Sequence, residues 1–260
     1  MNAVLHLEPW QWAFGIAAAV VVGITKTGIP GAGILVVSLL AAAFGGRPSV
    51  GIMLPMLILG DLFAVTWYRK DVHWDKLVRL LPGVVAGMAL GAAALWWIGE
   101  LNSRRDILGI LIGSLVLAML VLHLLQDRLG ERLTPTSRPG AAVTGVLAGF
   151  TTTVSNAAGS IMSIYMAAHR VTKKEFVGTL AWYFFIVNVS KVPIYVALTL
   201  ANPRKPIITL QSLVFVAAVA PAIVTGVYLG KWTLNNISEK VFVWVVLTTA
   251  AVGAVKLILG

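Results

Sequence analysis

Two polar stretches interrupt long apolar segments of this 260-residue chain, and their residue types are suited to holding an anion. The first, Gly23–Gly33, combines two threonines and a lysine with four glycines. The second, Gly149–Gly159, begins 126 residues later and is rich in hydroxyl and amide side chains. Neither stretch contains a carboxylate, so hydrogen-bond donors and positive charge dominate both. This combination predicts a site for a small oxyanion rather than for a cation.

The backbone of these stretches adds to that chemistry. In the first stretch, a helix that restarts near Pro30 would present unpaired N–H groups and the positive end of its dipole. The glycines would let a ligand approach the backbone closely. The candidate substrate-binding residues are Thr25, Lys26, Thr27, Gly28, Gly31, Gly33, Thr152, Thr153, Ser155, Asn156 and Lys191. The alternative is that these small residues serve only the close packing of helices.

Three of the polar residues stand inside otherwise apolar segments. Lys191 should face protein or water rather than lipid, unless its side chain extends to the membrane interface. Asp61 is the only acid well inside an apolar segment, and it could pair with Lys26 or Lys191 or titrate during proton coupling. Asn188 follows Asp61 by 127 residues, so a repeat would place an acid in one half and its amide in the other.

Membrane-spanning helices are the elements that must position these residues. Hydrophobic residues make up 58% of the chain and charged residues 12%, with a mean hydropathy of +0.90. Soluble domains carry about twice that charged fraction. Apolar stretches of about 20 residues or more separate the short charged clusters, and this length is enough to cross a bilayer. We therefore expect an all-α polytopic membrane protein, surrounded by lipid.

The composition also weighs against several other classes of protein. A net charge of +10 is expected to reflect cytoplasmic loops rich in Lys and Arg rather than a nucleic-acid partner. The chain has no cysteine, which excludes disulfides and thiolate metal sites. The H-E-x-x-H, G-x-S-x-G and P-loop motifs are missing. We expect no enzyme activity, catalytic residue, cofactor or metal site. A membrane-embedded enzyme or an assembly factor is the less favoured alternative.

The chain divides into two related halves of four segments each. Residues 1–125 form the first repeat, residues 126–139 a polar inter-repeat loop, and residues 140–260 the second repeat. Pro82–Gly91 matches Pro221–Gly230 at five identical positions, with an offset of 139. The two polar stretches match at an offset of 126. These matches in corresponding segments predict a duplication.

Each repeat is predicted to open with a broken or re-entrant helix. As one helix, segment 10–45 would be roughly 50 Å long against a hydrocarbon core of roughly 30 Å, yet each arm alone is too short to cross. The same holds for segment 140–168. A hairpin followed by three crossing helices gives an odd number of crossings, so the two halves would be inverted. With an external N-terminus, this arrangement places most loop Lys and Arg on the inner side.

The two broken segments and the two Pro-x-x-Val-x-Gly-x-x-Leu-Gly helices resemble those of the sulfite exporter TauE/SafE family of membrane anion permeases, also called the TSUP family. The resemblance covers essentially the whole chain. It implies a secondary active transporter of small sulfur-containing anions, such as sulfite, sulfoacetate or isethionate, in a prokaryotic plasma membrane. Proton coupling through Asp61 is a hypothesis, and an anion channel built on the same helix ends is the alternative. The expected partners are the anionic substrate and lipid, with a homodimer left open.

Overall fold

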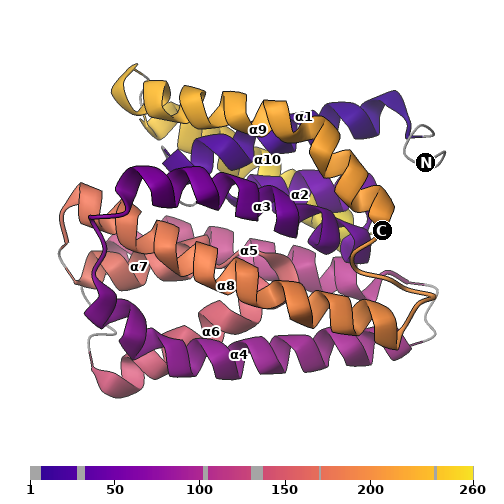
Figure 1. Ribbon diagram of the computed structural model, residues 1–260, viewed down its shortest axis with the longest axis horizontal. Coiled ribbons are helices and arrows are strands. Elements are labelled where there is room, and N and C mark those ends of the chain that lie inside the picture. The colour runs from indigo at the N-terminus through magenta and orange to yellow at the C-terminus, as the bar shows by residue number, and fades with distance from the viewer. Residues whose placement is uncertain are drawn as a thin grey trace.

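The structure is a computed structural model, and it describes residues 7–27, 33–101, 105–129, 137–169, 171–236 and 239–259. Regular structure in these ranges consists of ten α-helices and no strand (Figure 1), which confirms the predicted all-α class. The first five helices are α1 (Pro9–Thr27), α2 (Gly33–Phe44), α3 (Gly46–Tyr68), α4 (Trp74–Glu100) and α5 (Ile107–Leu129). The other five are α6 (Arg138–Ser155), α7 (Gly159–Ala168), α8 (Lys173–Ala201), α9 (Leu210–Asn236) and α10 (Glu239–Leu259).

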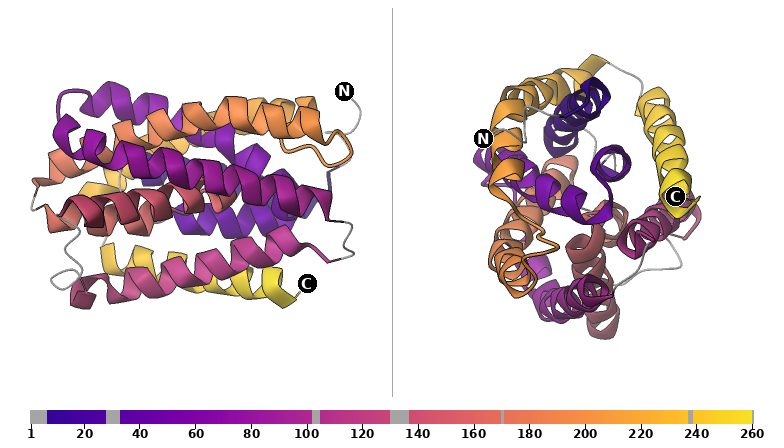
Figure 2. Two further views of the ribbon diagram at one scale, coloured as in Figure 1. Left: turned by 90° about the horizontal axis from the view of Figure 1, so that it is seen from below. Right: turned by 90° about the vertical axis from the view of Figure 1, so that its right-hand side faces the viewer.

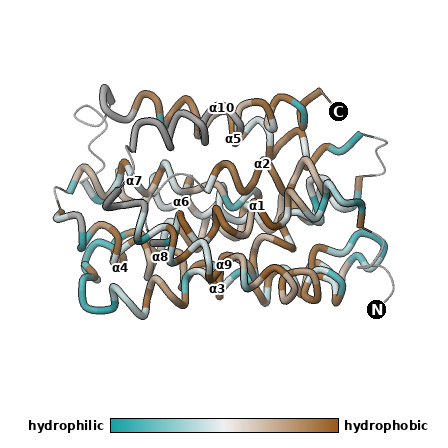
Figure 3. The backbone as a smooth tube through the Cα atoms, turned by 90° about the horizontal axis from the view of Figure 1, so that it is seen from above, coloured by the Kyte–Doolittle hydropathy of each residue, from teal (hydrophilic) through white to brown (hydrophobic). Residues whose placement is uncertain are grey.

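The surface of the bundle is suited to lipid. Among the described residues, five helices are long and apolar enough to cross a membrane, namely α3, α4, α5, α8 and α9. Their outer faces expose large apolar side chains such as Val85, Trp97 and Leu200. Hydrophilic residues gather instead towards the two ends of the bundle (Figure 3). Because an aqueous protein rarely exposes so much apolar surface, the chain is a multi-pass membrane protein, as predicted.

The first segment of each half turns back on itself as a helical hairpin. Gln11 near the start of α1 donates a hydrogen bond of 2.8 Å to the carbonyl oxygen of Ala43 near the end of α2. In the second hairpin, α6 ends at Asn156, which adopts the left-handed conformation with φ of 58° and so reverses the chain. Tyr165 of α7 then returns to the beginning of α4, where its hydroxyl donates to the carbonyl oxygen of Lys76 at 3.2 Å.

Each hairpin packs against a long helix of the other half, with α1 along α9 and α6 along α4. Glycine permits this close approach at matched positions. A Cβ atom on Gly87 of α4 would overlap the carbonyl oxygen of Val146 on α6. A Cβ atom on Gly226 of α9 would overlap the carbonyl oxygen of Val20 on α1. The helix faces thus meet backbone to backbone, as small residues allow in membrane proteins.

The same correspondence holds from the side of the hairpins. Gly149 of α6 lies against the carbonyl oxygen of Val84, and Gly23 of α1 lies against that of Ile223. The partners in α1 and α6 are related by the offset of 126, and those in α4 and α9 by the offset of 139. The two halves therefore exchange hairpins rather than form separate lobes. This reciprocity supports the predicted inverted duplication, whose boundaries stay a prediction.

Between the hairpins, α3 packs against α8. The helices run roughly along one common direction, and the end-on view shows how they surround the interior (Figure 2). α3 and α8 carry Asp61 and Asn188 into this interior, where both side chains are fully buried. Asp61 and Asn188 occupy related positions in the two predicted repeats. The packing of α3 against α8 brings these two side chains together.

Candidate functional site

The two hairpins border one cavity of about 70 Å³ near their tips, by which we mean the described residues 25–27 with 33–34 in the first hairpin and residues 152–159 in the second. Gly33 and Gly159, the first residues of α2 and α7, both line it. Because the first turn of a helix presents unpaired N–H groups and a positive dipole end, two such ends converge on the same space. The hairpin residues that line the cavity are Thr25, Lys26, Gly33, Ile34, Thr152, Asn156, Ala157 and Gly159. Apolar side chains of α3 and α8 complete the walls.

Lys26, in the last turn of α1, is the charged group on this cavity. Its Nζ atom lies 2.6 Å from Oδ1 of Asp61 and 4.7 Å from the ring centre of Phe184. The stem of the lysine packs over Gly60 of α3, where a Cβ atom would come within 2.9 Å of its Cγ atom. The lysine side chain is 9% exposed and the aspartate fully buried, so the pair is held out of solvent.

The carboxylate of Asp61 is compensated on both oxygens. Oδ1 faces Lys26, and Oδ2 accepts a hydrogen bond of 2.6 Å from the side-chain amide of Asn188. Of the partners considered for Asp61, the structure places Lys26 against it. If both lysines are protonated, then Lys26, Asp61 and Lys191 together carry one net positive charge. A bound monoanion would balance that charge.

Lys191 lies behind the cavity wall rather than on it. Its side chain is fully buried, and Nζ donates to the carbonyl oxygen of Thr152 at 3.1 Å and to its hydroxyl oxygen at 3.2 Å. The same ammonium group donates to Oδ1 of Asn156. Lys191 is therefore not at the interface with lipid. It is placed to act on a ligand only through the residues that it holds.

Asn156 connects Lys191 to the cavity, and Lys191 would influence a ligand by orienting the Asn156 side chain. An ammonium group can only donate, so the amide oxygen of Asn156 must face Lys191 and its NH₂ group must face the other way. Asn156 lines the cavity and is 7% exposed, and its Nδ2 atom has no hydrogen-bond partner among the described residues. A buried donor without a partner is costly, so this amide is suited to an anionic ligand.

The predicted hydroxyl donors are not equivalent. Thr153 and Ser155 lie outside the cavity lining, and their hydroxyls donate within α6 to the carbonyl oxygens of Gly149 and Thr151. The hydroxyl of Thr25 borders the cavity but donates to Val22 at 2.8 Å. The hydroxyl of Thr152 accepts from Lys191, which leaves its own hydrogen free to donate.

The structure describes only part of the rest of the first polar stretch. Gly28 and Gly31 lie outside the described residues. Thr27 is the last residue of α1, and its side chain is not described. Gly33 begins α2, and a Cβ atom there would meet no heavy atom of the described residues within 4 Å.

One face of α8 contributes residues that the sequence analysis did not single out. Phe184 contacts Lys26, and Tyr195 donates a hydrogen bond of 2.7 Å to the carbonyl oxygen of Thr153. Together with Asn188 and Lys191 they recur at intervals of four, three and four residues, which is the spacing of one helix face. Phe184 and Tyr195 could have been predicted from this spacing, because Asn188 and Lys191 already identified the helix face that points into the protein.

Comparisons with known proteins point to the same class of molecule. A family model described as "Sulfite exporter TauE/SafE" matches residues 15–257. No curated protein and no solved structure matches the chain. The family match includes both hairpins, the cavity between their tips and the long helices that pack against them. The chain therefore belongs to the sulfite exporter TauE/SafE family of membrane anion transporters.

Proposed function

We propose that the chain is a secondary active transporter that carries small sulfur-containing anions across the plasma membrane through the cavity between the hairpin tips. One observation carries this proposal: the starts of α2 and α7, Lys26 and Asn156 all border the same cavity. The carboxylate that pairs with Lys26, Asp61, has a partner on each oxygen. The site thus offers donors and positive potential, which an oxyanion requires.

The size of the cavity favours the smallest members of the class. A volume of about 70 Å³ has room for a few water molecules, and hence for sulfite or a sulfonate with a very short carbon chain. Oxygen atoms of such an anion would accept from the amide of Asn156, the hydroxyl of Thr152 and the N–H groups at the starts of α2 and α7. Lys26 would supply the countercharge. Sulfoacetate and isethionate would need the cavity to widen.

The packing of the hairpins suggests how access could alternate. α1 would move with α9, and α6 with α4, because these two pairs of helices meet along glycine-lined faces, and each hairpin would carry its second helix with it. Rocking of one unit against the other would open the cavity first to one side and then to the other. Asp61 is the candidate for proton coupling, because an anion that attracts Lys26 would compete with this carboxylate.

Counterflow in reconstituted vesicles tests the proposal. Vesicles loaded with unlabelled sulfite should transiently accumulate labelled sulfite, because a carrier exchanges its substrate. The Lys26→Ala variant should lose at least about tenfold in rate, since a charge-assisted hydrogen bond is worth about 1.5–3 kcal/mol. The exposed Lys70, in the turn after α3, provides the matched control: Lys70→Ala should behave as the unaltered protein.

Two results would contradict the proposal. Equilibration of label without transient accumulation would indicate a channel, because an open pore does not couple the two fluxes. If neither sulfite nor short sulfonates enter faster than in protein-free vesicles, the chain does not transport small sulfur-containing anions.

A further inference from the structure

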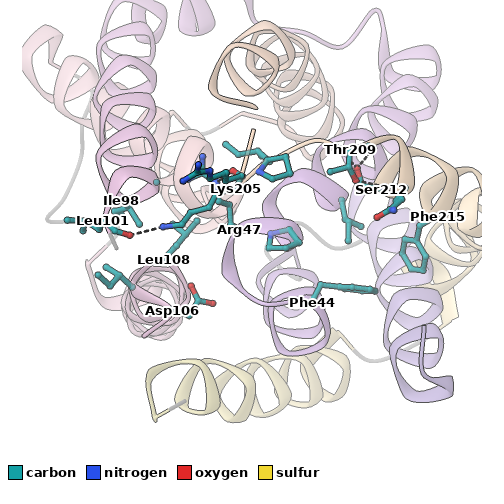
Figure 4. Close-up of a pocket in the computed structure, with 18 of the residues that line it drawn as sticks. Phe44, Arg47, Ile98, Leu101, Asp106, Leu108, Lys205, Thr209, Ser212 and Phe215 are labelled. Atoms are coloured by element: carbon teal, nitrogen blue, oxygen red, sulfur yellow. Dashed lines mark hydrogen bonds between the residues drawn. The ribbon is translucent and has the colours of Figure 1, made fainter. Parts of the chain in front are cut away.

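A second cavity, of about 500 Å³, lies at one end of the bundle. It is formed where α2 gives way to α3, where α4 gives way to α5 and where the loop after α8 leads into α9 (Figure 4). We call it the end cavity. It shares no lining residue with the cavity between the hairpin tips. Its function is therefore a separate question from that of the transport site.

The end cavity is strongly cationic. Its charged lining residues are Arg47, Arg105, Arg204, Lys205 and Asp106. Asp106, the one carboxylate among them, accepts hydrogen bonds from the backbone N–H groups of Gly46 at 2.7 Å and Gly109 at 2.8 Å. Asp106 thus joins the starts of α3 and α5, and its charge is directed at backbone groups. Arg47, Arg204 and Lys205 remain to attract an anion.

Two of these cations are held in place by neutral groups. Arg47 is half-buried, and its Nε and Nη1 atoms donate to the carbonyl oxygens of Lys205 at 2.6 Å and Leu95 at 3.0 Å. Lys205 in turn donates from Nζ to the carbonyl oxygen of Leu101 at 2.7 Å. Carbonyl oxygens orient a cation without cancelling its charge. Glu100 acts on Arg47 from nearby, but it is exposed and forms no ion pair with it among the described residues.

The rest of the lining is largely apolar. Ile98 and Leu108 lie on one side of the space, and Phe44 and Phe215 lie on the other (Figure 4). Ile52 is a further apolar residue of the lining. A volume of about 500 Å³ falls within the usual range for small-molecule sites, which is about 300–1,000 Å³. A bare inorganic ion would leave most of this space and its apolar wall unused. A ligand that carries an apolar body as well as a charge would use both.

We propose that the end cavity binds an amphipathic organic anion, with its sulfonate, carboxylate or phosphate head at Arg47, Arg204 and Lys205 and its apolar body against Phe44, Ile52 and Ile98. Such a ligand is too large for the 70 Å³ cavity between the hairpin tips. The same chemistry could come from a dissolved organic anion or from an anionic lipid. The proposal does not depend on which anion the chain transports.

Binding of naphthalene-2-sulfonate tests the proposal directly. The full chain in phosphatidylcholine nanodiscs should bind this probe in equilibrium dialysis, above the background of protein-free nanodiscs. Arg47→Gln should weaken binding at least about tenfold, because it removes a hydrogen-bonded charge. Arg204→Glu should weaken it about fivefold, and more at low ionic strength. Because Arg204 is exposed and has no partner among the described residues, that variant should fold normally.

Matched variants separate this site from the transport site. Arg69→Glu reverses an exposed charge just after α3, away from the end cavity, and should leave probe binding unchanged. The double variant Lys26→Met, Asp61→Ala, which leaves neither charge of this pair buried alone, should also leave probe binding unchanged, whereas it should impair sulfite counterflow. Loss of probe binding in this double variant would place the probe at the hairpin tips and overturn the proposal.

Varying the lipid composition of the nanodiscs distinguishes an anionic lipid from a dissolved anion as the occupant of the end cavity. If phosphatidylglycerol in the nanodiscs displaces the probe from the unaltered protein, the occupant is an anionic lipid. If the probe binds equally with and without phosphatidylglycerol, the occupant is a dissolved anion. Failure to bind the probe at millimolar concentration, or binding that is insensitive to both Arg47→Gln and Arg204→Glu, would overturn the proposal.

Discussion

The two hairpins make matched glycine contacts with the long helices but carry different polar side chains near their tips. In the first tip, the charge lies on the hairpin itself, at Lys26, and its counter-ion Asp61 comes from α3. In the second tip, the residue that corresponds to Lys26 is the neutral Thr152, and the charge comes from Lys191 on α8. Lys191 points at the hairpin backbone and at the side chain of Asn156 rather than at the cavity.

We call the glycine-lined contacts between the hairpins and the long helices the hairpin frame. The comparison shows that this shared packing does not determine which polar side chains each hairpin carries. Glycine contacts at two pairs of equivalent positions, Gly23 with Gly149 and Gly87 with Gly226, bring helix backbones together in the same way in both halves. The polar side chains near the tips are not matched in this way. One tip therefore offers a cation to the cavity, and the other offers an amide that a buried lysine orients. Substitutions in the two tips should accordingly have different consequences.

The largest effect is expected at Asp61, because the first tip alone depends on a buried countercharge. Asp61→Ala leaves Lys26 without its ion pair and Asn188 without its acceptor. Breaking a buried ion pair from one side typically costs about 3–5 kcal/mol of unfolding free energy. Thermal unfolding in detergent should show a large fall in Tm. An unchanged Tm would mean that the pair is not formed in the folded protein.

Lys26→Met combined with Asp61→Ala is the control for that prediction. The double variant no longer buries an uncompensated lysine, so its Tm should lie above that of Asp61→Ala alone. If the double variant is less stable by the sum of both single losses, the two residues are not coupled.

A smaller and symmetric effect is expected at the glycines of the hairpin frame. Gly23→Ala and Gly149→Ala each place a methyl group against a carbonyl oxygen of the partner helix. Overpacking of this kind costs about 1–3 kcal/mol, partly offset by about 1 kcal/mol of gained helix propensity. Both variants should lower Tm to a similar extent. Gly33→Ala, whose methyl group would meet no heavy atom of the described residues within 4 Å, should change Tm little.

The smallest effect is expected at Lys191, because it acts on a ligand through Thr152 and Asn156 rather than by direct contact. Lys191→Met should weaken sulfite binding about fivefold, in line with one hydrogen bond of about 1 kcal/mol. The same substitution should cost less affinity in the Asn156→Ala background, because only Thr152 is then left for the lysine to orient. Isothermal titration gives both comparisons. Additive losses would show that the effect of Lys191 does not pass through Asn156.

The sequence was sufficient to predict which segments break and which residues meet in the interior. The breaks at Gly23–Gly33 and Gly149–Gly159 were visible because polar and small residues are rare in apolar segments. A buried ion pair of Asp61 with either Lys26 or Lys191, and a relation of Asp61 to Asn188 through the repeat, were expected for the same reason, and the structure places Lys26 against Asp61. A buried polar group needs a hydrogen-bond or charge partner. Because the apolar segments contain few polar residues, each of them has few possible partners.

The direction of individual side chains was not predictable in the same way. Thr153 and Ser155 are hydroxyl residues of the right stretch, yet they bond to the carbonyl four residues earlier, a choice that any threonine or serine in a helix can make. Whether Lys191 reaches the cavity depends on how α8 is rotated against α6. That rotation is set by packing, which sequence periodicity does not report.

Sulfite binding by isothermal titration tests the central claim, that one anion is held between both hairpin tips. The unaltered protein should bind one sulfite ion. Lys26→Ala in the first tip and Asn156→Ala in the second should each weaken binding, the first by at least about tenfold and the second by about fivefold, while Lys70→Ala changes nothing. If either tip can be altered without loss of affinity, the anion is not shared between them, and the account is wrong.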